Sequence, residues 1–391
     1  MKQIKLLNKI AKVGTDRFDP AAYAVSADIE SPDAIMVRSA SMHDMEFDPS
    51  LKAIARCGAG VNNIPLDKCA DAGIVVFNTP GANANGVKEL TIAALLLASR
   101  NIIGGVEWAK TLVPESAVTG GVAKAVEAGK SAFGGVELKG KTLGVIGLGA
   151  IGGLVANAAK SLGMTVVGCD PYITVDAAWG LSSSIKKAAT YEEVYAQSDY
   201  ITLHVPATKE TKGMINKDTI ALMKKGVRIV NLARADLVNA VDLEKAIADG
   251  QVAAYVTDFP TEETVNVPGI IAIPHLGAST EESEDNCAVM AADQLTAYLE
   301  TGNIKNSVNY PAIEMPRMDA NRIVILHKNI PNMISHVTST LAERNINIEN
   351  MANRSRGEYA VTLVDTYAEI TPEMQAQIES EEGIIRVIVI D

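Results

Sequence analysis

The chain alternates short apolar segments with longer amphipathic ones along most of its length. The apolar segments are brief, rich in Val and Ile, and bounded by Gly, Pro, Asp or Asn. Such runs are typical of strands buried on both faces of a parallel sheet, with the amphipathic segments as crossover helices. The pattern predicts an α/β fold with doubly wound sheets. The segments that carry it are residues 34–37, 74–77, 142–146, 165–169, 200–203, 228–232 and 270–273.

The last part of the chain has a different rhythm. A polar connector that contains proline covers residues 302–316. After it, the pattern predicts strands at residues 322–327, 347–353, 359–365 and 384–390, and helices at residues 332–344 and 372–379. The order βαββαβ is that of a ferredoxin-like unit, which is complete in itself.

A glycine-rich turn follows the apolar segment 142–146 directly. It has the form Gly147-x-Gly149-x-x-Gly152 and is followed by a helical pattern. In a dinucleotide-binding unit the first glycine permits the tight turn, the second lets the backbone approach a pyrophosphate, and the third lets helix and strand pack closely. The free N–H groups at the helix start then face the phosphates. The context on both sides predicts a dinucleotide site.

Asp170 ends the next apolar segment. This is the spacing expected for the acid that hydrogen-bonds the ribose hydroxyls of the adenosine. Its charge would repel a 2′-phosphate, and no Arg follows it directly. The sequence therefore favours NAD over NADP.

Polar side chains follow three later strand segments. Arg234 comes after the first, Asp258 after the second with Glu262 and Glu263 close behind, and His275 after the third. The carboxyl ends of parallel strands form the site in open α/β sheets, so these groups should converge. Arg is a planar fork suited to a substrate carboxylate. A His with a carboxylate partner is an acid/base that works near neutral pH. This set fits a hydroxy-acid dehydrogenase.

The composition argues against several classes of binding partner. The 391 residues carry a formal net charge of −12 and only 4% aromatic residues, which disfavours nucleic acid and anionic membranes. The 4 cysteines are scattered without metal-ligand spacing, so neither a disulfide framework nor a metal site is expected. No signal-peptide pattern or apolar run long enough to span a bilayer is present, and we expect a cytoplasmic protein.

The chain resembles the D-isomer-specific 2-hydroxyacid dehydrogenases. The matching segments run through most of the sequence. They are Val37-Arg38-Ser39 and residues 57–62 (CGAGVN), 78–83 (NTPGAN), 147–152 (GLGAIG), 204–206 (HVP), 231–234 (NLAR) and 274–280 (PHLGAST).

The resemblance implies oxidation of a small 2-hydroxy acid, with 3-phospho-D-glycerate as the expected substrate and serine biosynthesis as the setting. Arg234, a Glu and His275 would be catalytic: Arg234 holds the substrate carboxylate, His275 moves the hydroxyl proton, and the Glu orients His275. Arg38, Ser39 and Asn83 would also touch the substrate. The implied NAD-binding residues are Gly147, Gly149, Ala150, Ile151, Gly152, Asp170, His204, Val205, Pro206, Leu232, Ala233, Arg234, Asp258, His275, Gly277 and Ala278.

Two positions depart from the family pattern. The family often has Asp-Val-Phe before the catalytic Glu, whereas here Phe259 follows Asp258 at once. Counting from Arg234 selects Glu263, and aligning on the Phe-Pro-Thr-Glu segment selects Glu262; we prefer Glu263. Lys88 replaces a common Ala, and it either adds charge near the substrate phosphate or is a solvated lysine.

Residues 322–391 resemble an ACT domain, a small regulatory fold that binds amino acids. The resemblance implies L-serine as an effector held by His327, Asn329 and Asn347. Asn332 stands where the family favours Gly. The alternative is a module that only dimerises by pairing sheet edges.

We expect three domains. Residues 1–87, completed by 280–306, would form a flavodoxin-like substrate domain, and residues 88–279 a Rossmann-type NAD domain. Residues 307–321 would be a linker and 322–391 the ACT-like domain. A homodimer or homotetramer is implied. The alternatives are another D-2-hydroxyacid dehydrogenase, acting on glycerate, lactate or a sugar-acid phosphate, and an NAD(H)-sensing protein without catalysis.

Overall fold

The computed structural model describes residues 1–112 and 120–390. The chain forms two compact units, Met1–Asn83 with Glu281–Asp391, and Ala84–Thr280. Each unit contains a parallel sheet, which confirms the predicted α/β class. The finer division into three domains stays a prediction, and its boundary after residue 87 falls inside a helix, α3 (Ala84–Ser99).

The unit Ala84–Thr280 is built on a seven-stranded sheet of order β12-β11-β10-β9-β6-β7-β8. All its strand pairs are parallel. In chain order this is the 3-2-1-4-5-6 arrangement of dinucleotide-binding sheets with one more strand at the β12 edge. The strands are β6 (Thr142–Ile146), β7 (Thr165–Cys169), β8 (Lys186–Lys187), β9 (Tyr200–Leu203), β10 (Val227–Asn231), β11 (Val252–Thr257) and β12 (Ile270–Ala272).

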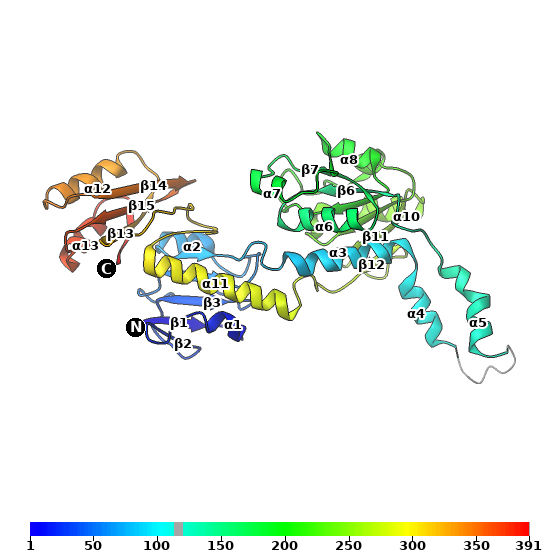
Figure 1. Cartoon of the computed structure of the whole chain (residues 1–391), viewed down its shortest axis with the longest axis horizontal. Coiled ribbons are helices and arrows are strands. Elements are labelled where there is room, and N and C mark those ends of the chain that lie inside the picture. The colour runs from blue at the N-terminus through cyan, green and yellow to red at the C-terminus, as the bar shows by residue number, and fades with distance from the viewer. Residues whose placement is uncertain (113–119, 391) are drawn as a thin grey trace. The chain divides into compact units, whose positions relative to one another are not determined.

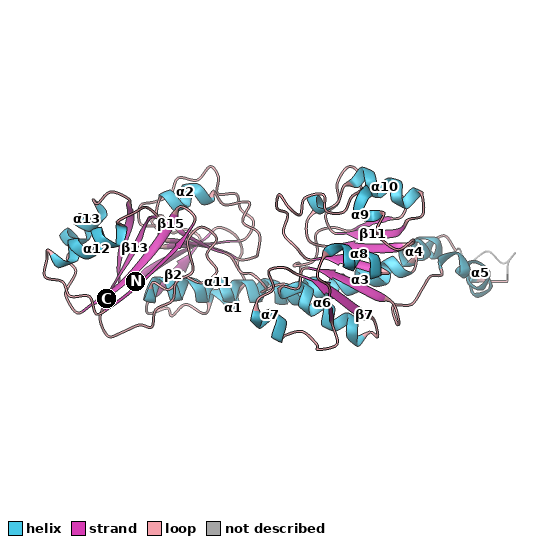
Figure 2. Ribbon diagram, turned by 90° about the horizontal axis from the view of Figure 1, so that it is seen from above, coloured by secondary structure: helices cyan, strands magenta, loops and turns pink. Residues whose placement is uncertain are grey.

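Helices cover both faces of this sheet (Figures 1 and 2). The helices α3 and α6 (Ala150–Ser161) bury apolar residues against one face, and α8 (Tyr191–Gln197), α9 (Lys217–Ile220) and α10 (Ala240–Ala248) against the other. The unit also contains α4 (Ile102–Lys110), α5 (Val122–Gly129), α7 (Val175–Trp179) and 3₁₀ turns at Lys130–Phe133 and Ala235–Leu237. No residue of α4 or α5 is buried.

The other unit begins with a five-stranded parallel sheet of order β2-β1-β3-β4-β5, which is the flavodoxin-like order that we predicted. Its strands are β1 (Lys2–Leu6), β2 (Tyr23–Ser26), β3 (Ala34–Val37), β4 (Ala53–Arg56) and β5 (Val75–Phe77). The helices are α1 (Lys12–Thr15), α2 (Leu66–Asp71) and α11 (Glu281–Thr301), the last packing on the sheet through Ala291 and Leu295.

The C-terminal part of this unit is the predicted βαββαβ module. It consists of β13 (Asn321–Lys328), α12 (Met333–Ala342), β14 (Asn350–Arg356), β15 (Tyr359–Thr366), α13 (Pro372–Glu379) and β16 (Ile384–Ile390). Its antiparallel sheet has the order β14-β15-β13-β16. The helices pack on one face through Val337 and Ile378. The opposite face, with Val324 and Leu363, joins the apolar core that contains Leu295.

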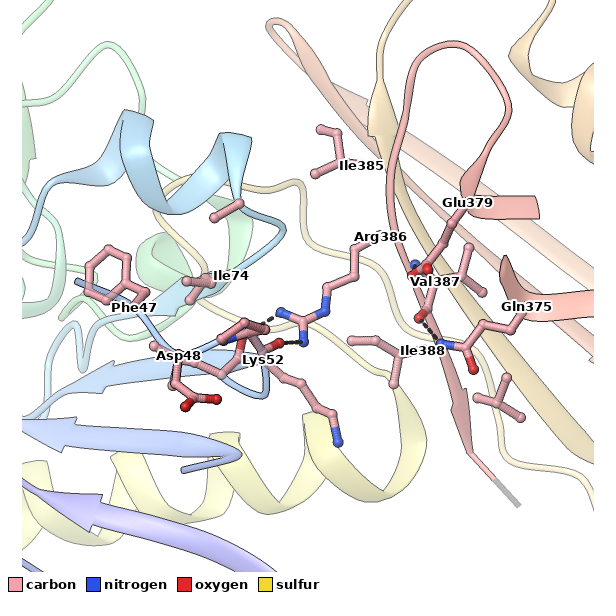
Figure 3. A pocket seen from close by; sticks show the side chains of 14 residues that line it. Phe47, Asp48, Lys52, Ile74, Gln375, Glu379, Ile385, Arg386, Val387 and Ile388 are labelled. Atoms are coloured by element: carbon pink, nitrogen blue, oxygen red, sulfur yellow. Dashed lines mark hydrogen bonds between the residues drawn. The ribbon is translucent and has the colours of Figure 1, made fainter. Parts of the chain in front are cut away.

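Polar contacts also attach the module to the parallel sheet of its unit. Lys328 forms an ion pair with Asp71 of α2 (2.7 Å), and the Tyr359 hydroxyl donates to the same carboxylate (2.8 Å). Arg386 of β16 donates to the carbonyls of Pro49 (2.6 Å) and Leu51. Figure 3 shows this guanidinium on the wall of a cavity of about 540 Å³.

Within residues 1–112 and 120–390, no helix is long and apolar enough to cross a bilayer. The same residues contain no group of three His, Cys, Asp or Glu side chains that could hold a metal ion.

Candidate active site

The glycines of the loop between β6 and α6 meet different constraints. Gly147 has a φ of +88°, and a Cβ there would lie 2.5 Å from the His204 carbonyl oxygen. A Cβ at Gly152 would lie 1.9 Å from the Gly147 carbonyl oxygen. At Gly149, in contrast, a Cβ would meet nothing within 4 Å. The start of α6 is thus closely packed on the protein side and open at Gly149, where a pyrophosphate could approach its N–H groups.

Asp170 is fixed beside this loop at the end of β7. One carboxylate oxygen accepts the Leu148 N–H (2.8 Å), and the other accepts the Tyr172 N–H (2.9 Å). A carboxylate has about four acceptor positions, so further ones are available for ribose hydroxyls. The negative charge next to the loop disfavours a 2′-phosphate.

The backbone of His204 packs against the turn at Gly147. Its Nε2 lies 3.0 Å from the Thr202 hydroxyl oxygen, and burial lowers the pKa of His204 to about 4. The ring is therefore neutral at pH 7 and is poorly suited to accept a proton there. Val205 and Pro206 follow it at the edge of the sheet, where Val205 is half-buried and Pro206 exposed.

Arg234 lies three residues beyond β10, in a turn organised by Asn231. The guanidinium is exposed, and its Nη1 donates to the Ala233 carbonyl (2.6 Å). The Asn231 side chain is fully buried and hydrogen-bonds the backbone of Ala233 and Arg234. Sequence reasoning placed Asn231 in a family segment without giving it a role.

Asp258 follows β11 and is 1% exposed. Burial raises the pKa of its carboxyl, and the charges of His275 and Arg234 and the Gly277 N–H oppose that rise. Its Oδ1 is buried without a hydrogen-bond partner among the described residues. A buried acceptor without a partner is costly, so this oxygen is suited to a ligand that brings an N–H donor.

His275 follows β12, and its side chain is exposed. Its ring packs on that of Phe259, with the centroids 4.5 Å apart. The Arg234 guanidinium carbon lies 5.8 Å from the same Phe259 ring. Because β10, β11 and β12 are adjacent parallel strands, their carboxyl ends place Arg234, Asp258 and His275 in one group. Leu232 and Gly277 are buried nearby, whereas Ala233 and Ala278 are half-buried.

The structure does not bring the predicted glutamate to His275. Glu262 and Glu263 are both exposed, and in the described part of the chain neither forms a hydrogen bond or an ion pair with His275. Hydrogen bonds from its own N–H and from the Thr261 hydroxyl lower the pKa of the Glu263 carboxyl. The Asp258 carboxylate interacts with the charge of His275. The choice between Glu262 and Glu263 stays a prediction.

The predicted substrate residues Arg38, Ser39 and Asn83 belong to the other unit. The Arg38 Nη2 lies 2.7 Å from a carboxylate oxygen of Glu284 on α11. The Asn8 Oδ1 accepts the N–H groups of Arg38 (3.0 Å), Ser39 (3.1 Å) and Ala40 (3.1 Å). Asn8 thus fixes the turn after β3, a role that no local sequence signal indicated.

The predicted effector residues lie in the C-terminal module. His327 is 2% exposed, its Nε2 lies 2.9 Å from the Thr362 hydroxyl, and burial lowers its pKa. Asn329 donates to the Gly357 carbonyl (3.0 Å), and Asn347 to the Glu349 carboxylate (2.6 Å). Asn332 has a φ of +69°, so it adopts the left-handed conformation for which the family favours Gly.

Residues 112–277 match the family described as D-isomer specific 2-hydroxyacid dehydrogenase, NAD binding domain. This part of the chain is thus similar to the NAD-binding domain of that family. The match covers the glycine loop, Asp170 and the Arg234, Asp258 and His275 group, and it confirms the predicted fold and the predicted cofactor, NAD.

Curated relatives extend the similarity. The chain is 37% identical to a D-3-phosphoglycerate dehydrogenase of Bacillus subtilis, over 72% of this chain and 52% of the relative. It is 34% identical to one of Methanocaldococcus jannaschii, over 82% of this chain and 59% of the relative. The chain spans little more than half the length of these relatives. Among solved structures, NAD+-bound 3-phosphoglycerate dehydrogenase of Entamoeba histolytica is 28% identical with a TM-score of 0.60, over 79% of this chain and 98% of that one.

The residues present fit NAD. The opening at Gly149 suits a pyrophosphate, the fixed carboxylate of Asp170 suits ribose hydroxyls, and the unpartnered Asp258 Oδ1 suits the carboxamide N–H of a nicotinamide.

Proposed function

We propose that the protein catalyses the NAD-dependent oxidation of 3-phospho-D-glycerate to 3-phosphooxypyruvate, the first step of L-serine biosynthesis. The observation that best supports this is the grouping of Arg234, Asp258 and His275 after adjacent parallel strands. A guanidinium for a carboxylate and an imidazole for a hydroxyl proton are what oxidation of a 2-hydroxy acid requires. The names of the curated relatives support the substrate.

In this proposal Arg234 holds the substrate carboxylate through parallel N–H donors. His275 accepts the proton of the C2 hydroxyl during oxidation and returns it during reduction. Bound NAD would supply the acceptor for the hydride that leaves C2. Asp258 holds the nicotinamide side through the oxygen that lacks a partner. Glu263, or Glu262 as the alternative, would orient His275 once the segment after Phe259 brings a carboxylate to it.

The remaining cofactor contacts that we propose come from the loops after β6, β7, β9, β10 and β12. They are Gly147, Gly149, Ala150, Ile151, Gly152, Asp170, His204, Val205, Pro206, Leu232, Ala233, Gly277 and Ala278. The close packing of Gly147 and Gly152 and the fixed position of Asp170 support the contacts from the loops after β6 and β7.

Arg38, Ser39 and Asn83 are proposed to bind the substrate, with Arg38 for the phosphate. The Arg38 guanidinium already pairs with Glu284 at 2.7 Å, and both side chains are more than one third exposed. Exposed pairs contribute little stability, so a doubly charged phosphate could take the place of Glu284. The Lys88 side chain is 21% exposed and lies 3.5 Å from Glu89, and it stays a second candidate for the phosphate.

The C-terminal module, residues 322–391, is proposed to be a regulatory ACT-like domain that binds L-serine through His327, Asn329 and Asn347. The ion pair of the neighbouring Lys328 with Asp71 supports this, because it links the effector segment to α2. A module that only dimerises stays the alternative.

We also propose a homodimer or homotetramer in the cytoplasm. Ile102, Ile103 and Val106 of α4 are each more than 40% exposed, which is costly for apolar side chains without a partner. The four cysteines are free and buried, and this supports the proposal of a reducing compartment.

The test is NADH formation with 3-phospho-D-glycerate, compared with D-glycerate and D-lactate, in the presence and absence of L-serine. We expect turnover of the phosphorylated acid and its collapse in His275→Ala, with NADH binding retained. Better turnover of an unphosphorylated acid would favour another D-2-hydroxyacid dehydrogenase. NADH binding without turnover of any acid would favour a sensor.

A further inference from the structure

The aromatic ring of Phe259 contacts both side chains that carry the proposed chemistry. Its centroid lies 4.5 Å from that of the His275 imidazole, with the two planes tilted by 46°. The guanidinium carbon of Arg234 lies 5.8 Å from the same centroid. These separations are those of a favourable aromatic pair and of a cation–π contact.

We propose that Phe259 is a positioning residue of this site, which fixes the Arg234 guanidinium and the His275 imidazole at the spacing that one substrate molecule needs. The proposal rests on the proposed function for the roles of Arg234 and His275. It concerns how their geometry is maintained before substrate arrives.

Phe259 is itself well anchored. It lies two residues beyond the end of β11, and its N–H donates to the Thr257 side-chain oxygen (3.1 Å). Asp258 before it is buried, and Pro260 after it restricts the backbone. Arg234 and His275, in contrast, are exposed side chains, although the Arg234 guanidinium also donates to the Ala233 carbonyl. A half-buried, anchored ring between these two exposed groups limits the conformations of both.

The ring also has an electrostatic role. Once His275 has taken the hydroxyl proton, it and Arg234 are two cations near the same ring, and the Asp258 carboxylate interacts with both charges. The face of an aromatic ring is electron-rich and attracts cations. Phe259 therefore tolerates the imidazolium and the guanidinium at the same time, which an aliphatic side chain of similar volume would not do.

The sequence contains a signal for this residue. Where the family often places a Val between the Asp and the Phe, this chain has none, so Phe259 directly follows the buried Asp258. Asp258 and Phe259 form a bend directly after β11, so the ring and the buried carboxylate leave the end of the strand together.

The first test compares Phe259→Leu with Phe259→Tyr in the full-length chain. The Leu variant keeps an apolar side chain without the aromatic face, and we expect kcat/KM for the best hydroxy-acid substrate to fall about tenfold. The Tyr variant should stay within about threefold of wild type because the ring is kept. NADH affinity and thermal stability should change little in either. Phe133→Leu, which removes a ring that packs on Trp108, is the matched control and should leave kcat/KM unchanged.

The second test needs no turnover. Oxalate is a dicarboxylate probe for Arg234, and its binding to the NADH-loaded protein can be followed by nicotinamide fluorescence. We expect Phe259→Leu to weaken oxalate binding about tenfold and to shift the His275 imidazole resonance in the NMR spectrum, because the ring current is lost. If wild type turns over no acid, the proposed function fails. The oxalate titration and the NMR spectrum then decide by themselves whether Phe259 is a positioning residue. Unchanged oxalate affinity and an unmoved His275 resonance in the Leu variant, or no oxalate binding by wild type, would overturn the positioning role.

Discussion

The side-chain amide of Asn231 holds the backbone of Arg234 from both ends. Its Oδ1 accepts the Arg234 N–H (3.3 Å), and its Nδ2 donates to the Arg234 carbonyl (2.8 Å). The same amide accepts the Ala233 N–H (3.1 Å) and donates to the Tyr255 hydroxyl (3.1 Å). Because Asn231 is fully buried and Arg234 is exposed, the backbone that carries the guanidinium is held by this amide.

Asn231→Ala should therefore reduce kcat/KM more than it reduces NADH affinity. Buried backbone groups that lose their partners cost about 1–3 kcal/mol, which corresponds to roughly 5- to 150-fold in kcat/KM. Steady-state kinetics and NADH titration measure the two effects. Tyr255→Phe removes only one of the four bonds and is the matched control. Equal losses in the two variants would show that Arg234 does not depend on this amide.

Gly152→Ala should weaken NADH binding at least about tenfold, because the new methyl would collide with the Gly147 carbonyl and displace the turn. Gly153→Ala is the control one position along. There the nearest atom to a Cβ is a Leu181 methyl at 3.4 Å, an ordinary contact, so NADH affinity should be retained. Fluorescence titration compares them. If the two variants bound NADH equally, the loop would not hold the pyrophosphate.

His204 should make stability depend on pH in the acid range. Its pKa is about 4 in the folded chain against an ordinary value of 6.5, so between these values the unfolded state binds the extra proton. Stability is therefore lost as pH falls from 6.5 towards 4. On moving from about pH 7.5 to about pH 5, urea unfolding should show wild type losing about 1–2 kcal/mol more than His204→Gln. His327 is present in both proteins, so its contribution to the pH dependence cancels in the comparison. An identical acid loss in both would contradict the burial of His204.

The ion pair of Arg322 with Asp365 should be the most sensitive point of the C-terminal module. Both side chains are fully buried, and the guanidinium also donates to the carbonyls of Thr301, Met315 and Pro316. Asp365→Ala leaves a buried charge without its partner and should cost about 3–5 kcal/mol of unfolding free energy. Lys12→Ala, which breaks an exposed pair with Asp16, should cost less than about 0.5 kcal/mol.

Calorimetry and NADH titration separate the consequences of Asp365→Ala. The NADH affinity of the unit Ala84–Thr280 should persist, because that unit has its own sheet and its own apolar clusters. Joint loss of NADH binding and of the C-terminal module would contradict this independence.

The parts of the fold that the sequence predicted are those that local chemistry determines. The strand at residues 142–146, its glycine turn and Asp170 lie close together in the chain, and apolar runs between turn residues leave few alternatives. The last βαββαβ module was predictable for the same reason, because its alternation is strong and its turns are short.

The parts that could not be predicted depend on distant residues. Asn8 fixes the turn at Arg38 from 30 positions away, and no local pattern reports that contact. The proposed pairing of His275 with Glu263 or Glu262 depends on the path of the segment after Phe259, which is one residue shorter than the family pattern. The burial of His327 likewise follows from Thr362 on a neighbouring strand.

The most direct test of the proposed oxidation is the fate of the hydrogen at C2 of the proposed substrate. Wild-type protein is mixed with NAD and 3-phospho-D-glycerate that carries deuterium at C2, and the reduced cofactor is examined by mass spectrometry. We expect the deuterium in the nicotinamide ring and no labelled cofactor with His275→Ala. Deuterium released to water, or no reduced cofactor from the wild-type protein, would contradict the proposed oxidation.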